Sequence, residues 1–154
     1  MLYTPLTKKA LKLCFDAHRD QLDKSGLPYV FHPFHLAEQM DSENAVILAL
    51  LHDVVEDSPC THEDLQQMGF PVPVLEALRL LTHDDEEPYD SYIARIALSP
   101  LARQVKLADL RHNSDTTRLD TMDEWALARQ AKYLRAIEFL ENAPETGTES
   151  GQSD

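Results

Sequence analysis

Apolar residues recur along this chain with the spacing of amphipathic helices, and this periodicity limits the fold more than any other feature of the sequence. No alternation of apolar and polar residues, as a half-buried strand would need, lasts for more than a few positions. Only four of the 154 residues are glycine. The sequence therefore predicts a compact all-α domain, with several helices packed around one core.

Helix-start and helix-stop residues predict where these helices lie. Thr4 and Ser99 each precede a proline, which is typical of a cap followed by the first helical position. The segment from Thr61 to Asp64 resembles a capping box. The expected helices cover residues 4–22, 32–40, 42–57, 61–69, 73–82, 89–98, 100–112 and 122–141.

The last predicted helix marks the expected end of the domain. It carries an apolar stripe, made of Trp125, Leu127, Ala131, Leu134, Ile137 and Leu140. Residues 142–154 are rich in Glu, Thr, Ser and Gly and include no large apolar side chain. We therefore expect one domain over residues 1–141, followed by a disordered acidic tail over residues 142–154.

The charge balance excludes several kinds of partner. With 14 Lys and Arg against 27 Asp and Glu, the net charge is −13, which argues against nucleic acid and against anionic membranes. No apolar run reaches the roughly 18 residues that a membrane span needs. With two cysteines and no signal peptide, we expect a cytoplasmic protein with a small-molecule ligand. A homo-oligomer is possible through the last helix and the region around Tyr89 and Tyr92.

A His-Asp pair in the 42–57 helix is the sharpest chemical signal. Seven small or apolar residues lead directly into His52 and Asp53, and Glu56 and Asp57 follow one turn later. Three acids and a histidine beside a buried stretch are costly unless another charge compensates them. Imidazole and carboxylate ligands suit Mn, Fe or Zn, so the pattern indicates a divalent cation.

Two distant segments can complete the ligand set. His32 precedes Pro33 at a helix start, and Asp109 follows an apolar helical run. His35, one turn after His32, is a competing candidate on the same side of that helix. Together with His52 and Asp53, His32 and Asp109 give four N and O ligands, which leaves positions open for water and substrate, as in a catalytic metal site. Glu56 or Asp57 could then reach the attacking water as general base.

Four segments, taken in their order along the chain, resemble the HD-domain hydrolase of the RelA/SpoT homologues. They are Ala17-His18, residues 24–33 (KSGLPYVFHP), residues 50–58 (LLHDVVEDS) and residues 105–113 (VKLADLRHN). The short chain resembles the single-domain small alarmone hydrolases of that family. Members of the family remove pyrophosphate from the 3′ position of ppGpp or pppGpp, giving GDP or GTP.

The resemblance implies a role for each matching residue. It implies that His32, His52, Asp53 and Asp109 bind a single Mn²⁺ ion, and that Glu56 and Asp57 position and activate the attacking water. It also implies that Lys24, Asn113 and Thr116 contact the substrate.

Arg19-Asp20 replaces the Gly-Gln of the family pattern, and at two further positions an acidic residue replaces a basic one. Asp23 stands where the family has an arginine that packs on the guanine base, and Asp115 stands where the family has a basic residue. The sequence therefore leaves open an HD-domain phosphohydrolase of another nucleotide or phosphoester, and a non-catalytic module that senses a nucleotide. The Glu56-Asp57 pair favours an enzyme over a sensor.

Overall fold

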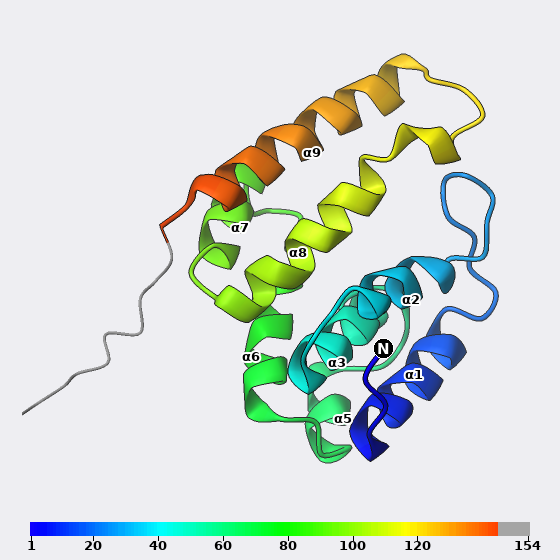
Figure 1. The fold of residues 1–154 in the computed structure, drawn as a ribbon, viewed down its shortest axis with the longest axis vertical. Coiled ribbons are helices and arrows are strands. Elements are labelled where there is room, and N and C mark those ends of the chain that lie inside the picture. Colours follow the sequence, from blue (N-terminus) through cyan, green and yellow to red (C-terminus); the bar gives the residue numbers. More distant parts are fainter. Residues whose placement is uncertain (145–154) are drawn as a thin grey trace, which may run out of the picture.

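A computed structural model describes residues 1–144 of the chain, and these residues form helices and loops (Figure 1). The expected all-α class is confirmed, since the described residues contain no strand beyond an isolated bridge between Leu22 and Pro28. None of the described helices is long and apolar enough to cross a lipid bilayer. The elements are α1 (Pro5–Ala17), α2 (Phe31–Glu38), α3 (Glu43–Leu51), α4 (Val54–Asp57), α5 (His62–Gln67), α6 (Val72–Leu81), α7 (Tyr89–Ile96), α8 (Pro100–Asn113), the 3₁₀-helix η1 (Thr116–Arg118) and α9 (Glu124–Asn142).

The predicted caps are in place. Thr4 and Thr61 each form a capping box, with Thr7 and Asp64 three residues later. The hydroxyl groups of Ser42 and Ser99 accept hydrogen bonds from the backbone N–H groups at the starts of α3 and α8. Each cap satisfies an N–H group that has no partner within its helix, and so fixes where the helix begins.

Removal of the Ser42 cap should weaken the fold measurably. The Ser42 hydroxyl accepts from the N–H of Ala45 at 3.2 Å, and no other side chain caps that end of α3. Ser42→Ala should lower the free energy of unfolding by about 1 kcal/mol, measured by urea denaturation. Ser42→Asp, which keeps an acceptor oxygen, should retain wild-type stability; equal losses in both variants would contradict a capping role.

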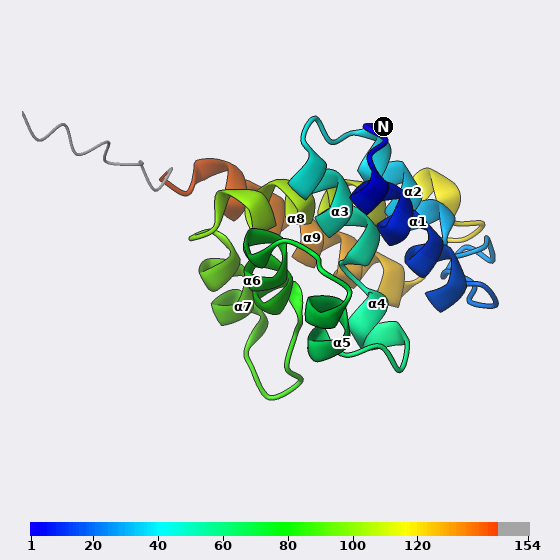
Figure 2. The ribbon, with the colours of Figure 1, turned by 90° about the horizontal axis from the view of Figure 1, so that it is seen from below.

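Helix α3 lies at the centre of the molecule. Figures 1 and 2 show α1 and α2 on one side of it, and α6 and α8 on the other. All seven residues from Ala45 to Leu51 are buried. A helix that is apolar on every side is stable only inside a protein. Its C-terminal end therefore delivers His52 into the interior.

The long helix expected over residues 42–57 is interrupted at His52 and Asp53. The His52 ring nitrogen Nδ1 lies 2.6 Å from the carbonyl oxygen of Ala49. That oxygen would accept the backbone N–H of Asp53 if α3 continued, so the side chain competes with the helix. The backbone resumes as the short helix α4 and places Glu56 and Asp57 on it.

The expected first helix is also too long, because α1 ends at Ala17. The next residue, His18, is buried, and its Nδ1 atom lies within hydrogen-bond distance of Gln21 Oε1, at 2.8 Å. Residues 21–29 then fold back on themselves, with backbone hydrogen bonds between Asp23 and Leu27 and between Tyr29 and Gln21. This loop stands beside the candidate site described below.

The predicted stripe of α9 is correct at Ile137 and Leu140 and wrong at its other four positions. Trp125, Leu127 and Leu134 are exposed, and the side that faces the core carries Ala126, Tyr133, Ala136, Ile137 and Leu140. The helix extends to Asn142, one residue beyond the expected domain end. From residue 145 onward, the predicted acidic tail lies outside the described residues.

Candidate active site

Three of the four predicted metal ligands come together in the interior. His32 comes from α2, His52 from the junction of α3 and α4, and Asp109 from α8. One potential ligand atom from each lies within 4.8 Å of those of the other two, and all three residues are buried. This group, called the triad below, could hold a metal ion. His35 is not part of it; its ring packs on that of His112 at 4.3 Å.

The Nδ1 atoms of both imidazoles have partners outside the triad, so the Nε2 atoms face it, and the Nε2 of His32 lies 2.8 Å from Oδ1 of Asp109. A carbonyl oxygen can only accept, so the Nδ1 of His52 donates to Ala49, and its buried Nε2 has no hydrogen-bond partner among the described residues. The Nδ1 of His32 lies 2.6 Å from the Nδ1 of His112. Burial, followed by the neighbouring His32, lowers the pKa of His112 to about 4, so neutral His112 can accept this proton. The donor set therefore fits a divalent cation.

Asp109 is held in its charged form. Lys106 donates to Oδ2 at 2.9 Å, and Asn113 donates to Oδ1 at 3.0 Å. Burial opposes the charge, but Lys106 and the two histidines keep the pKa of Asp109 well below its usual value. Lys106 was not predicted as a site residue, although its position three residues before Asp109 on a helix is a signal for such a pair.

Asp53 lies beside the triad rather than within it. Its Oδ2 is 3.1 Å from the Nε2 of His52 and accepts a hydrogen bond from the hydroxyl of Tyr29. Although burial opposes it, the charge of His52 lowers the pKa of Asp53 to about 2. Asp53 is thus a carboxylate within reach of the triad, and its role as the fourth ligand is a proposal.

The two members of the Glu56-Asp57 pair have different surroundings. Glu56 lines a cavity together with His52, Asp53 and Asp109, and its Oε1 accepts the N–H of His83 at 2.7 Å. Burial raises the pKa of Glu56 above its usual value. Asp57 does not line that cavity, and its Oδ2 accepts from the side chain of Gln21 at 3.1 Å. Of these two acids, only Glu56 lines a cavity that members of the triad also line.

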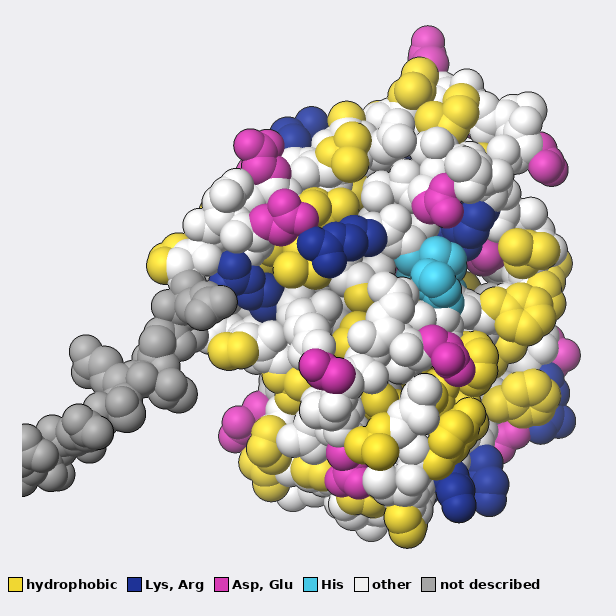
Figure 3. Space-filling model, in the orientation of Figure 1, with side chains coloured by type: hydrophobic (Ala, Val, Ile, Leu, Met, Phe, Trp, Pro, Cys, Tyr) yellow, Lys and Arg dark blue, Asp and Glu magenta, His cyan; other side chains and the backbone are white. Residues whose placement is uncertain are grey.

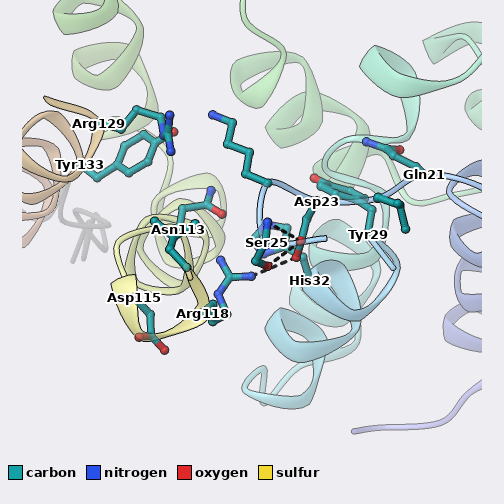
Figure 4. Close-up of a pocket in the computed structure, with 13 residues that line it drawn as sticks. Gln21, Asp23, Ser25, Tyr29, His32, Asn113, Asp115, Arg118, Arg129 and Tyr133 are labelled. Atoms are coloured by element: carbon teal, nitrogen blue, oxygen red, sulfur yellow. Dashed lines mark hydrogen bonds and ion pairs between the residues drawn. The ribbon is translucent and has the colours of Figure 1, made fainter. Parts of the chain in front are cut away.

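A cavity of about 280 Å³ opens on the His32 side of the triad and is called the loop cavity here (Figure 4). Figure 4 shows Arg129 and Tyr133 of α9 across from Asp23, Ser25 and Tyr29 of the loop. Of the predicted substrate contacts, Lys24 and Asn113 line it and Thr116 does not. Arg118, Arg129 and Tyr133 also line it and were not predicted; they lie on elements assigned to packing or to no structure.

The two acids that depart from the family pattern hold loops in place. Asp23 Oδ1 accepts from the N–H and hydroxyl of Ser25 and from the N–H of Leu27, and Oδ2 accepts from Arg118 at 3.2 Å. Asp115 caps η1 by accepting from the N–H and hydroxyl of Thr117. The charge of Asp23 is thus paired within the protein, and Asp23 and Arg118 both line the loop cavity.

The pH dependence of stability should reveal this use of Asp23. Burial alone would raise its pKa, but the hydrogen bonds from Ser25 and Leu27 and the charge of Arg118 lower it. Ionised Asp23 therefore stabilises the folded protein at pH values above the pKa of the unfolded state, which is about 4. This stabilisation is lost as the pH falls through the lower pKa of Asp23 in the folded state. The stability difference between wild type and Asp23→Asn, from urea denaturation, should shrink between pH 5 and pH 3. A difference that stays constant would contradict the ionic role.

A second cavity, of about 180 Å³, lies on the other side of the triad. It is called the tyrosine cavity here, because Tyr89, Tyr92 and Tyr133 line it. Lys106 and Lys132 line it as well, so five of the 14 Lys and Arg residues border one cavity or the other. Figure 3 shows Lys and Arg side chains on both sides of a histidine patch, on the face of the molecule that Figure 1 presents to the viewer. Five carboxylates line the same two cavities, so the charges of these side chains balance, and a divalent cation at the triad would add the positive charge that an anionic ligand needs.

Comparison with known proteins gives relatives that are named as ppGpp hydrolases, as a bifunctional (p)ppGpp synthase/hydrolase or as GTP pyrophosphokinases. No family model matches the sequence. The bifunctional (p)ppGpp synthase/hydrolase SpoT of Escherichia coli (strain K12) is 32% identical over 124 residues, which are 71% of this chain and 18% of that protein. The guanosine-3′,5′-bis(diphosphate) 3′-pyrophosphohydrolase of Haemophilus influenzae is 36% identical over 116 residues, or 66% of this chain and 17% of that protein. This chain therefore spans less than a fifth of these bacterial relatives.

Two shorter relatives match over most of both chains. The guanosine-3′,5′-bis(diphosphate) 3′-pyrophosphohydrolase MESH1 of Danio rerio is 28% identical over 144 residues, which are 85% of this chain and 79% of that protein. A solved structure, described as a metazoan orthologue of SpoT that hydrolyses ppGpp and plays a role in starvation responses, superposes with a TM-score of 0.74. The superposition covers 93% of this chain and 89% of the other, at 24% identity.

The chain shares the all-helical fold of that solved structure and encloses a buried His/His/Asp group. Its sequence is homologous to the hydrolase region of SpoT and to MESH1, which confirms the resemblance to an HD-type ppGpp hydrolase domain seen in the sequence.

Proposed function

We propose that this chain is a metal-dependent phosphohydrolase that removes pyrophosphate from the 3′ position of ppGpp or pppGpp. The observation that carries the proposal is the buried triad between two cavities bordered by cations. Relatives named as ppGpp 3′-pyrophosphohydrolases support the same substrate. The ion pair between Asp23 and Arg118 supports it further, because the charge of that acid is compensated within the protein.

We propose Mn²⁺ as the cation, held by His32, His52, Asp109 and Asp53. Two imidazoles and two carboxylates suit Mn²⁺, and the buried Nε2 of His52 has no hydrogen-bond partner among the described residues. When bound, such an ion supplies a Lewis acid that lowers the pKa of water and neutralises phosphate charge. Lys106 and Asn113 would hold Asp109 in the ligating orientation.

The side chains around the triad have distinct tasks in this proposal. Glu56 would accept a proton from the attacking water, with Asp57 in a supporting role, and the water oxygen forms a bond to the phosphorus atom next to the ribose. The bond from that phosphorus to the 3′ oxygen breaks, the 3′ oxygen takes a proton, and pyrophosphate leaves. Lys24 and Asn113, which line the loop cavity, would bind the nucleotide, and Thr116 would contact it from η1.

A substrate panel tests the proposed function. Purified protein with Mn²⁺ should release pyrophosphate from ppGpp but not from ordinary nucleotides, and chelation of the metal should abolish release. Turnover of a different nucleotide or phosphoester, but not of ppGpp, would contradict the proposed substrate without contradicting the proposed metal site. Binding of ppGpp without turnover of any compound in the panel would make the chain a nucleotide-sensing module.

The oligomeric state and the location in the cell remain sequence-based proposals. A homo-oligomer would use the exposed apolar side chains of α9, which include Trp125 and Leu134. Light scattering of the purified protein measures its mass directly. A cytoplasmic location agrees with the proposed nucleotide substrate.

A further inference from the structure

The two cavities divide the space around the triad between them. The loop cavity reaches it through His32, and the tyrosine cavity reaches it through His52 and Asp109. Asn113 and Tyr133 line both. The tyrosine cavity, at about 180 Å³, is smaller than the roughly 300–1,000 Å³ typical of sites for whole small molecules. It is therefore suited to one part of a ligand whose remainder lies in the loop cavity.

Two donors in the tyrosine cavity have no acceptor. The hydroxyl oxygen of Tyr89, at the start of α7, is buried and has no hydrogen-bond partner among the described residues. The Nζ of Lys132, on α9, lies 3.9 Å from the centroid of the Tyr89 ring and pairs with no carboxylate in the described part of the chain. A buried hydroxyl without a partner is costly, so such a group marks a place where a ligand can supply the acceptor.

The carboxylates that line the tyrosine cavity already accept hydrogen bonds from other groups of the protein. Glu56 accepts from the backbone of His83, Asp53 accepts from Tyr29, and Asp109 accepts from Lys106 and Asn113. The hydroxyl of Tyr89 and the ammonium of Lys132 therefore remain free to bind an added anion.

We propose that Tyr89 and Lys132 form a subsite for the terminal phosphate of the substrate's 3′ diphosphate, while the nucleoside and its 5′ phosphates occupy the loop cavity. This inference rests on the proposed function. Hydrolysis joins the water oxygen to the phosphorus next to the ribose and breaks its bond to the 3′ oxygen. The terminal phosphate stays with the released pyrophosphate, so the subsite binds the product as well. It would also favour a 3′ diphosphate over a 3′ monophosphate.

Product inhibition separates the two cavities. We would measure inhibition of ppGpp turnover by inorganic pyrophosphate and by GDP, at constant free Mn²⁺, in wild type, Tyr89→Phe, Lys132→Gln and Arg129→Gln. Lys132→Gln should raise the inhibition constant for pyrophosphate about tenfold, and Tyr89→Phe severalfold, with less than a twofold change for GDP. Arg129→Gln, a matched change in the loop cavity, should weaken inhibition by GDP alone.

Each outcome decides the inference. If Lys132→Gln weakens inhibition by GDP but not by pyrophosphate, the subsite is wrong. The conservative Tyr89→Phe variant removes only an oxygen, so it provides a test even if Lys132→Gln does not fold. If the wild type does not hydrolyse ppGpp, calorimetry with Mn²⁺ and inorganic pyrophosphate still measures the subsite: weaker binding in the variants supports it without the function. Absence of pyrophosphate binding to the wild type overturns it.

Discussion

Asp109→Asn should lower kcat/KM for ppGpp at least about a thousandfold, which corresponds to about 4 kcal/mol of transition-state stabilisation. Asp109 accepts from Lys106 and Asn113, and its Oδ1 lies 2.8 Å from the Nε2 of His32 and 3.6 Å from the Nε2 of His52. A neutral amide cannot balance a cation and leaves the buried Lys106 without its counterion. Steady-state kinetics and mass spectrometry of bound metal should show both losses together.

Control variants separate loss of the site from loss of the fold. Asp90→Asn makes the same chemical change at an exposed position of α7 and should leave activity and metal content unchanged. Asp53→Ala keeps the pair between Lys106 and Asp109 and should also lose metal if Asp53 is the fourth ligand. Full metal content and turnover in Asp109→Asn would rule out the proposed centre.

Glu56→Gln should lower kcat about 10²- to 10³-fold while the protein keeps its metal. Glu56 lines the tyrosine cavity with the triad, and burial raises its pKa toward the range of a useful general base. The glutamine oxygen can still accept from the N–H of His83, so the contact between α4 and that loop is preserved. Kinetics and metal analysis on the same preparation test both parts of this expectation.

Asp57→Asn is the matched comparison for Glu56→Gln. Asp57 contacts Gln21 and does not line the tyrosine cavity, so its replacement should lower kcat less than about tenfold. If Asp57→Asn abolishes turnover and Glu56→Gln does not, the two roles are reversed. If either variant loses the metal, that residue belongs to the ligand set.

The sequence predicts the site best where the local pattern and the fold demand the same residue. His52 follows a stretch that can only be buried, and the caps at Ser42 and Ser99 act within a few residues. The all-α class, the helix starts and the grouping of His32, His52 and Asp109 are therefore readable from local spacing and from the family resemblance.

Features that depend on distant side chains could not be read in the same way. The pairing of Asp23 with Arg118 joins residues far apart in the chain. The side of α9 that faces the core includes Tyr133 and Ala136, which are not part of the most apolar stripe, because packing against the rest of the protein sets the rotation of the helix. The break after α3 comes from a side chain that takes a backbone acceptor, which no periodicity records.

The triad gathers its members from three helical segments that are distant in the chain: α2, the end of α3 and α8. A cation held by all three would act as a reversible cross-link that closes two long loops of the polypeptide. Because the unfolded chain lacks this arrangement, ligation would favour the native state by mass action. The melting temperature should then rise with the concentration of free metal, even with no nucleotide present. The metal centre that we propose for catalysis would therefore also stabilise the folded state.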